Sequence, residues 1–137
     1  MKKRPRKGKK KEKRLTILVA AGDAALASDI RQILEKEIPQ SDILIVHDGE
    51  SAVDKLDANP HLVILDLNLP KLRGEGVMLA NELKGINAPV LVISSESRPD
   101  VEFMGDVNVM ATLQKPFRQD DLIQAIRAGA AGMGYDG

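Results

Sequence analysis

Five short apolar runs recur along the chain, and the segments between them have the apolar spacing of helices. The runs lie at 15–20, 42–47, 62–66, 89–94 and 109–113. Most of these runs are apolar throughout and do not alternate with polar residues, which is typical of strands covered on both faces. The pattern therefore predicts five strands of a parallel sheet.

The segments between the runs predict five helices. The clearest apolar stripe extends from Leu26 to Ile38 and ends at Pro39, which disrupts a helix. The second helix follows Asp48-Gly49 and ends at Asn59-Pro60, the third contains Leu79 and Leu83, the fourth starts around Pro99, and the fifth carries Leu122 and Ile126. Because strands and helices alternate, each of the first four helices is expected to connect one strand to the next strand along the chain.

Five consecutive strand–helix units predict an α/β fold: a flavodoxin-like, doubly wound five-stranded parallel sheet with strand order 2-1-3-4-5 and five flanking helices. Right-handed crossovers leave few other ways to wind such a chain. Ligands of these sheets bind outside the carboxyl ends of the strands. Asp66, Ser94 and Lys115 end or follow the third, fourth and fifth strands. We therefore expect them to share one rim of the sheet with residues 20–22, which follow the first strand.

Composition narrows the classes of function. A chain of 137 residues suits one domain. It contains no cysteine, which excludes disulfide frameworks, thiolate metal sites and thiol nucleophiles. No apolar run approaches the roughly 18 residues of a membrane span. We therefore expect a cytoplasmic protein that does not insert into a membrane.

Charge divides the chain into unequal parts. The first fourteen residues hold ten Lys and Arg against one Glu, a net charge of +9, and the remaining ten basic and nineteen acidic residues give −9. We expect a basic disordered arm at 1–14, a domain at 15–130 and a flexible Gly-rich tail at 131–137. The arm suits nucleic acid, an anionic surface or an acidic partner, or else serves as a solubilising leader or linker.

Five segments together resemble the receiver domain of two-component response regulators, over roughly residues 15–130. They are ILVAAGD, HDGESAVDKL, LVILDLNLP, PVLVISS and LQKPF, and their order and spacing match the family. The resemblance implies that Asp66 accepts a phosphoryl group from a histidine kinase or phosphotransfer protein, and that Ser94 and Lys115 hold the phosphoryl oxygens. It also implies a downstream protein partner on the face formed by helix 4, strand 5 and helix 5. Such a domain is not an enzyme, beyond phosphorylating and dephosphorylating its own Asp66.

One departure from the family concerns its metal. Where the family has two acids that hold Mg²⁺, this chain has Ala21 and Gly22, which offer no side-chain oxygen. Asp23 follows directly and is a candidate weak ligand, or else the N-cap of the first helix. With Asp66 and the backbone carbonyl of Asn68 as the other candidate ligands, we expect Mg²⁺ to bind weakly or not at all.

A second departure concerns the switch position three residues before Lys115. The family has Tyr or Phe there, whereas this chain has Thr112, which has no ring to move. Two hypotheses follow: a phosphoacceptor receiver with an impaired Mg²⁺ site, or a phosphorylation-independent pseudo-receiver that acts as a protein-interaction module. A nucleic-acid-binding protein acting through residues 2–14 is a third class, weakened because no DNA-binding motif follows the arm. His47 and His61 are expected to be solvated strand-end residues.

Overall fold

The five predicted strands form one parallel sheet in the expected order. The computed structural model describes residues 14–69, 83, 85, 87–95 and 107–132. The strands are β1 Leu15–Ala20, β2 Ser41–Val46, β3 Leu62–Asp66, β4 Val90–Ser94 and β5 Val109–Gln114. They pair in the order β2-β1-β3-β4-β5, so the strand order inferred from the sequence is confirmed.

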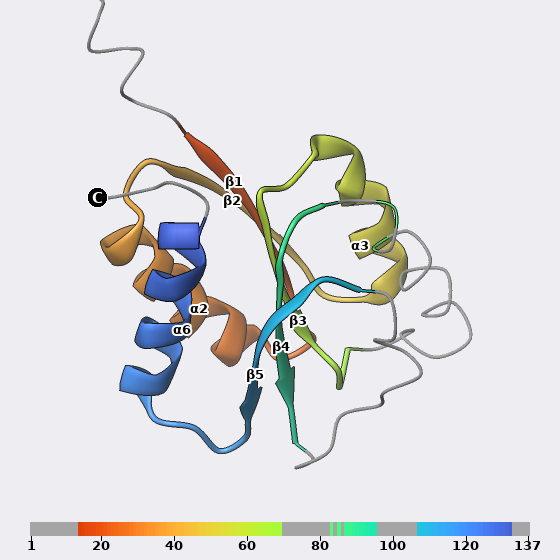
Figure 1. Ribbon diagram of the computed structural model, residues 1–137. Helices are drawn as coiled ribbons and strands as arrows, with labels where there is room; N and C mark the ends of the chain where they lie inside the picture. Colours follow the sequence, from red (N-terminus) through yellow and green to blue (C-terminus); the bar gives the residue numbers. More distant parts are fainter. Residues whose placement is uncertain (1–13, 70–82, 84, 86, 96–106, 133–137) are drawn as a thin grey trace, which may run out of the picture.

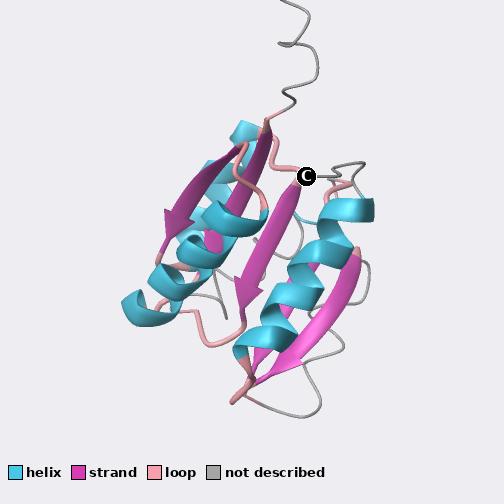
Figure 2. Ribbon diagram, turned by 90° about the vertical axis from the view of Figure 1, so that its left-hand side faces the viewer, coloured by secondary structure: helices cyan, strands magenta, loops and turns pink. Residues whose placement is uncertain are grey.

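Helices cover both faces of this sheet (Figure 1). Among the described residues they are α2 Ala24–Glu37, α3 Gly49–Lys55, the 3₁₀ turn η1 Leu56–Ala58, and α6 Gln119–Gly132. Helices α2 and α6 lie on one face and α3 on the other; Figure 2 looks onto the face with α2 and α6. The predicted third and fourth helices fall almost wholly outside the described residues, apart from the buried Leu83 and the exposed Gly85.

Polar side chains set the helix boundaries. The Asp23 side chain accepts hydrogen bonds from the backbone N–H groups of the first turn of α2, and Asp48 accepts one from Ser51 at the start of α3. At the end of η1, Asn59 has a left-handed φ of 55° directly before Pro60. Helix α6 continues to Gly132, so residues 131 and 132 of the segment predicted as a tail are helical.

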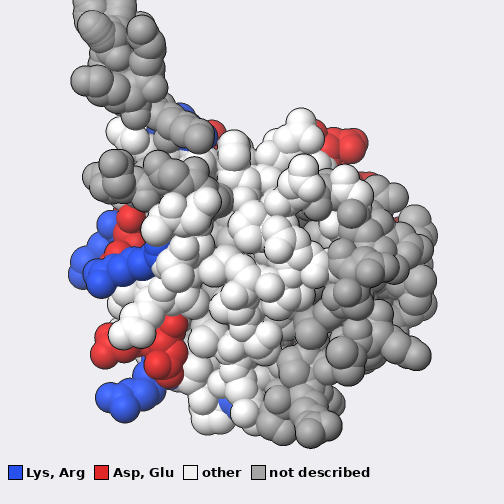
Figure 3. Space-filling model, in the orientation of Figure 1, with Lys and Arg blue, Asp and Glu red and all other residues white. Residues whose placement is uncertain are grey.

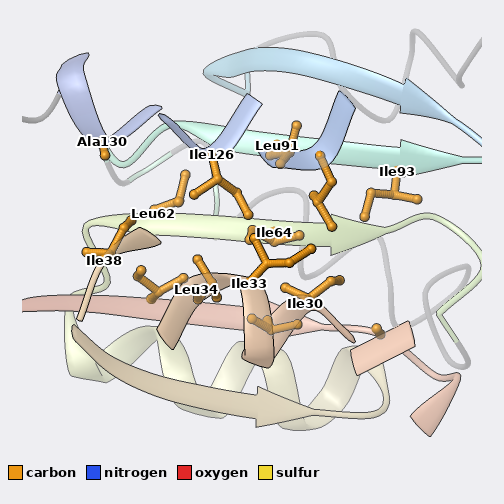
Figure 4. Close-up of a cluster of buried hydrophobic side chains, with 14 of the residues drawn as sticks. Ile30, Ile33, Leu34, Ile38, Leu62, Ile64, Leu91, Ile93, Ile126 and Ala130 are labelled. Carbon is orange, nitrogen blue, oxygen red and sulfur yellow. The ribbon is translucent and has the colours of Figure 1, made fainter. Parts of the chain in front are cut away.

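Two hydrophobic clusters, one on each face of the sheet, explain why the strands are apolar throughout. Successive residues of β3 contribute to opposite clusters, with Leu62 and Ile64 beneath α2 and α6, and Val63 and Leu65 on the other face. Figure 4 shows the cluster beneath α2 and α6, in which Ile30, Ile33 and Leu34 of α2 meet side chains of β3, β4 and α6. Ile38, the C-cap residue of α2, belongs to the same cluster. Asp66 directly follows Leu65, so the packing of β3 between the two clusters fixes the position of Asp66.

Arg14, directly before the predicted start of the domain at residue 15, contacts the first residues of β2. Arg14, assigned to the basic arm by charge, donates to Asp42 Oδ1 at 2.8 Å and to the Ser41 carbonyl at 2.9 Å. The Leu15 N–H then donates to the Gln40 carbonyl, which starts the pairing of β1 with β2. Arg14 therefore belongs to the folded domain, while residues 1–13 lie outside the described residues.

Candidate functional site

The carboxyl ends of the parallel strands bring three predicted site residues to one rim. Asp66 is the last residue of β3, Ser94 is the last residue of β4, and Lys115 directly follows β5. Pairing holds these ends together, because Asp66 is opposite Ile93 and Ser94 is opposite Gln114. The sheet therefore places an acid, a hydroxyl and an amine on neighbouring strands.

Asp66 is a buried carboxylate with a partner for each oxygen. Its exposed fraction is 2%, and its Oδ2 accepts a hydrogen bond from Lys115 Nζ at 2.8 Å. Its Oδ1 accepts one from the Asn68 N–H at 2.9 Å, and its backbone carbonyl accepts one from the Leu69 N–H at 3.0 Å. The turn after β3 thus holds the carboxylate in one orientation.

Lys115 connects the ends of β3 and β4. Its backbone N–H donates to the Ser94 carbonyl at 2.7 Å, while its ammonium reaches across to Asp66. The Lys115–Pro116 peptide bond is cis. Ser94 is 3% exposed and Lys115 is 27% exposed. The Lys115 ammonium lies beside the Asp66 oxygens, where negative charge would develop on a group bound to Asp66.

The other described residues at this rim, beside Asp66, supply few side-chain ligands for magnesium. Ala21 is buried and apolar, and Gly22 has no side chain. Asp23 Oδ1 accepts from the N–H groups of Ala25 and Leu26 at 2.8 and 3.4 Å, so this carboxylate caps α2 as the alternative interpretation expected. Within the described ranges, no three His, Cys, Asp or Glu side chains lie close enough to hold a metal ion. This donor set does not fit Mg²⁺, which prefers several oxygen ligands in octahedral geometry.

His47 has a structural contact at this rim that the sequence interpretation missed. Its side chain is exposed, as expected, but Nδ1 lies 2.9 Å from the Ala21 carbonyl oxygen. Because a carbonyl only accepts, Nδ1 carries the proton and donates. The bond ties the end of β2 to the residue that follows β1. The available signal was the position of His47 directly after a strand that neighbours β1.

His61 likewise is exposed and makes a specific bond, at the amino ends of the strands. Its Nδ1 accepts from the Thr16 N–H at 3.0 Å, and its own N–H donates to the Thr16 carbonyl at 2.7 Å. The proton of the neutral ring therefore lies on Nε2. His61 extends the pairing of β3 with β1 and lies far along the strands from the acid at the end of β3.

Thr112 lies on β5 opposite Val92 of β4, and its side chain is exposed. It is thus at the surface of an edge strand, two residues before the strand ends. The helix predicted before β5 lies outside the described residues, so the face expected to bind a partner is described only through β5 and α6.

A doubly wound sheet with a buried, lysine-paired carboxylate at the end of β3 defines the chain as a receiver-type α/β domain. The chain belongs to the response regulator receiver domain family, whose model matches residues 17–127. Proteins of this family are signalling domains of two-component systems and not classical enzymes, which agrees with the prediction that the chain is not an enzyme. Receiver domains generally bind Mg²⁺ at an acidic site.

Curated relatives include transcriptional regulatory proteins. The chain is 34% identical over 113 residues to PdtaR of Mycobacterium tuberculosis, covering 80% of this chain and 54% of that protein. It is 30% identical over 113 residues to CpxR of Escherichia coli K12, covering 82% of this chain and 47% of that protein. The chain therefore spans about half the length of the curated relatives it matches.

Solved structures of response regulators are similar to this chain. The phosphorylated cyanobacterial phytochrome response regulator RcpA is 25% identical, with a TM-score of 0.67 over 86% of this chain and 92% of that chain. The Mn²⁺-bound form of the response regulator Rcp1 is also 25% identical, with a TM-score of 0.65 over 85% and 92%. The response regulator domain of Thermotoga maritima CheB, 17% identical, shares the fold with a TM-score of 0.70 over 91% and 100%. Within the described part of the chain, no helix is both long and apolar enough to cross a membrane.

Proposed function

We propose that this chain is a receiver domain that accepts a phosphoryl group on Asp66 in a two-component phosphorelay, with an impaired Mg²⁺ site. The observation that carries the proposal is the pairing of the buried Asp66 carboxylate with the Lys115 ammonium at 2.8 Å. A buried carboxylate is stabilised by such a cation in any protein. The same cation also suits the uptake of a phosphoryl group, because phosphoryl transfer depends on positioning and charge neutralisation.

Each rim residue has a role in this reaction. An Asp66 carboxylate oxygen attacks the phosphorus of a phosphohistidine, forming an O–P bond as the P–N bond breaks. The histidine nitrogen keeps the bonding electron pair. Lys115 neutralises part of the charge on the phosphoryl oxygens, and the Ser94 hydroxyl donates a hydrogen bond to one of them.

The rate of this reaction is expected to be low. A bound metal ordinarily supplies several kcal/mol of charge stabilisation in the transition state, and about 1.4 kcal/mol corresponds to a factor of ten in rate. Asp23 and the Asn68 carbonyl are the remaining candidate ligands beside Asp66, and Asp23 already caps α2. Phosphorylation on the order of a hundredfold slower than with a complete acidic site follows from these figures.

Intact mass measurement after incubation with a small phosphodonor tests the acceptor assignment. We expect a phosphoryl adduct on the wild-type chain and none on Asp66→Asn. Asp54→Asn, which removes an exposed acid of α3, is the matched control and should keep the adduct. An adduct that persists in Asp66→Asn, or no adduct on the wild type in any buffer, contradicts the assignment.

A second candidate is a pseudo-receiver that binds its partner without phosphorylation. Two observations favour it: Ala21 and Gly22 replace the acidic pair, and the exposed Thr112 replaces the aromatic switch residue. Its partner would bind the face that includes β5 and α6 together with the predicted helix 4. Equal binding of a partner to the wild type and Asp66→Asn, with no adduct on either, would favour this function.

The proposed partners follow from the family. A histidine kinase or phosphotransfer protein supplies the phosphoryl group, and a downstream protein recognises the β5 and α6 face, in the cytoplasm. Residues 2–14 offer a further contact with nucleic acid. Loss of such binding with rising salt, and its abolition when the arm is removed, is the expected signature.

A further inference from the structure

The charge balance at the carboxyl rim differs from that of a site built to hold a divalent cation. Asp66 contributes one negative charge and Lys115 one positive charge at 2.8 Å, so the pair is neutral overall. Carboxylates at positions 21 and 22 would bring the rim to a net charge of about −2, which a divalent cation cancels. Ala21 and Gly22 leave no such excess of negative charge.

The contacts of Asp66 also disfavour the binding of a divalent cation. An incoming cation would have to displace the Lys115 ammonium from Oδ2 or the Asn68 N–H from Oδ1. It would gain few ligands in return, because Asp23 is already bonded to two N–H groups of α2. The Lys115 ammonium is part of the chain and competes with a metal ion for the Asp66 carboxylate. Ala21 and Gly22 provide no second carboxylate that would favour the metal ion.

We propose that Ala21 and Gly22 uncouple Asp66 from divalent cations, so that its phosphorylation proceeds at the same rate with and without Mg²⁺. This inference rests on the proposed phosphoacceptor function. With phosphoramidate as donor, an Asp66 oxygen forms a bond to phosphorus while the P–N bond breaks, and the amine leaves with the electron pair and takes a proton from water. Lys115 keeps its proton and is the cation that balances the phosphoryl charge.

The same uncoupling applies to the phosphorylated state. Hydrolysis of phosphoryl-Asp66 also builds negative charge around phosphorus, and here too the neighbouring cation is Lys115 rather than a metal. The lifetime of the adduct should therefore not change when EDTA is added. The signalling state of this domain would follow the supply of phosphodonor and not the level of Mg²⁺.

Two measurements test this inference: the rate of adduct formation from phosphoramidate, by intact mass in Mg²⁺ and in EDTA, and Mg²⁺ binding by titration calorimetry. For the wild type we expect a ratio of the two rates of about one and no binding heat. Gly22→Asp should restore both responses, with Mg²⁺ raising the rate by roughly tenfold or more. Gly22 is suited to this change because it is exposed, whereas Ala21 is buried.

Gly22→Asn is the matched control, since it adds a side chain of the same size without the charge, and should gain neither response. Ala21→Asp/Gly22→Asp is the second gain-of-metal variant. Stimulation of the wild type by Mg²⁺, or Mg²⁺ binding heat on the wild type, overturns the inference. Lack of any Mg²⁺ response in both Asp variants overturns the assignment to positions 21 and 22.

The proposed function fails separately. If the wild type forms no adduct in either buffer, the phosphoacceptor assignment is wrong and the calorimetry alone decides the metal question. Binding gained only by the Asp variants then supports the uncoupling of this rim from divalent cations, and binding by the wild type contradicts it.

Discussion

At the scale of single residues, the burial of Asp66 makes its partner important for stability. The carboxylate is 2% exposed, and Lys115 is its only described charged partner. Removing one member of a buried ion pair leaves the other charge uncompensated, which costs far more than removing both members. The stability of the rim and its chemistry therefore depend on the same contact.

Lys115→Met is expected to lower the free energy of unfolding by about 2 kcal/mol, below the range for fully buried pairs because Lys115 is partly exposed. In an Asp66→Asn background the same change should cost less than about 1 kcal/mol, since no buried charge remains. Urea unfolding of the four chains measures the coupling. Lys55→Met, at an exposed lysine of α3, is the control. Equal costs in the two backgrounds would mean that the ion pair does not contribute.

The sequence predicted which residues meet at the rim, because strand order and parallel direction are sufficient to bring Asp66, Ser94 and Lys115 to one edge. It could not supply the atoms involved. That Asn68 provides an N–H to Asp66, and that His47 donates to the Ala21 carbonyl, depends on the path of the turns after the strands. Turn geometry is set by local contacts that hydrophobic periodicity does not encode.

At the scale of elements, the predicted strands agree with the structure to within one residue at each end. Apolar composition places a strand, whereas pairing decides where it ends: β2 begins at Ser41 because that residue is opposite Leu15. For α6 the sequence predicted no end, because small residues such as Ala131 and Gly132 give no apolar stripe to follow, and the helix extends through both of them.

An ion pair joins the end of α2 to α6. Arg127 Nε donates to Glu37 Oε1 at 2.7 Å, and its Nη2 donates to Oε2 at 3.3 Å. The hydrogen bond from Arg127 lowers the pKa of Glu37 below its ordinary value of 4.5, and the hydrogen bond to the Glu37 carboxylate raises the pKa of Arg127 above its already high ordinary value. Arg127 is thus charged throughout the accessible pH range, and only Glu37 titrates.

Because the pKa of Glu37 is lower in the folded state, its contribution to stability is present above pH 4.5 and is lost as pH falls through the folded pKa. We expect Glu37→Gln to lower the melting temperature by a constant small amount above about pH 5, with a difference that shrinks as the pH falls further. Melting curves across this range measure it. Glu35→Gln, whose partner Arg31 lies in the same helix, is the comparison. A difference that grows on acidification would contradict the assignment.

Helix α6 also approaches β5 closely at Gly129. A Cβ added there would lie 2.9 Å from Met110 Sδ and 3.8 Å from Leu62 Cδ1. Met110 occupies this place because the β4–β5 register shifts: Val90 is opposite Val109, and Leu91 is opposite Ala111. Met110 is therefore the additional residue of the irregularity, and its flexible side chain fills the space beneath the helix.

Gly129→Leu should destabilise the fold by about 1–3 kcal/mol, because the larger side chain must displace Met110 and reach Leu62. Gly132→Leu is the matched control in the same helix, where an added Cβ meets nothing within 4 Å. The control should be neutral or slightly stabilising, since Leu favours helix more than Gly does. Chemical unfolding compares the two, and similar stabilities would show that α6 can move away from β5 without cost.

At the scale of the whole molecule, charge is segregated although the formal net charge is zero. The first fourteen residues carry +9 and the rest −9. In Figure 3, basic and acidic side chains of the described residues lie next to one another at the left edge, over α2 and α6, and a separate group of acidic side chains lies at the upper right, on the side of α3. The middle of this face is uncharged. Arg127 and Glu37 neutralise each other at this edge. Counted over the sequence, the residues from 15 onward keep an excess of nine acidic side chains, and the first fourteen residues carry an equal excess of basic ones.

Opposite charges on arm and domain favour contacts between copies at low ionic strength. The screening length is about 30 Å at 0.01 M salt and about 8 Å at 0.15 M, so such contacts should form in dilute buffer and dissociate at physiological salt. Light scattering should therefore give a larger apparent mass at low salt for the full chain. A chain lacking residues 2–13, which keeps the Arg14–Asp42 pair, should stay at one mass because its copies repel one another. Association that persists at high salt, or in the truncated chain, would show that a surface of the domain itself is responsible.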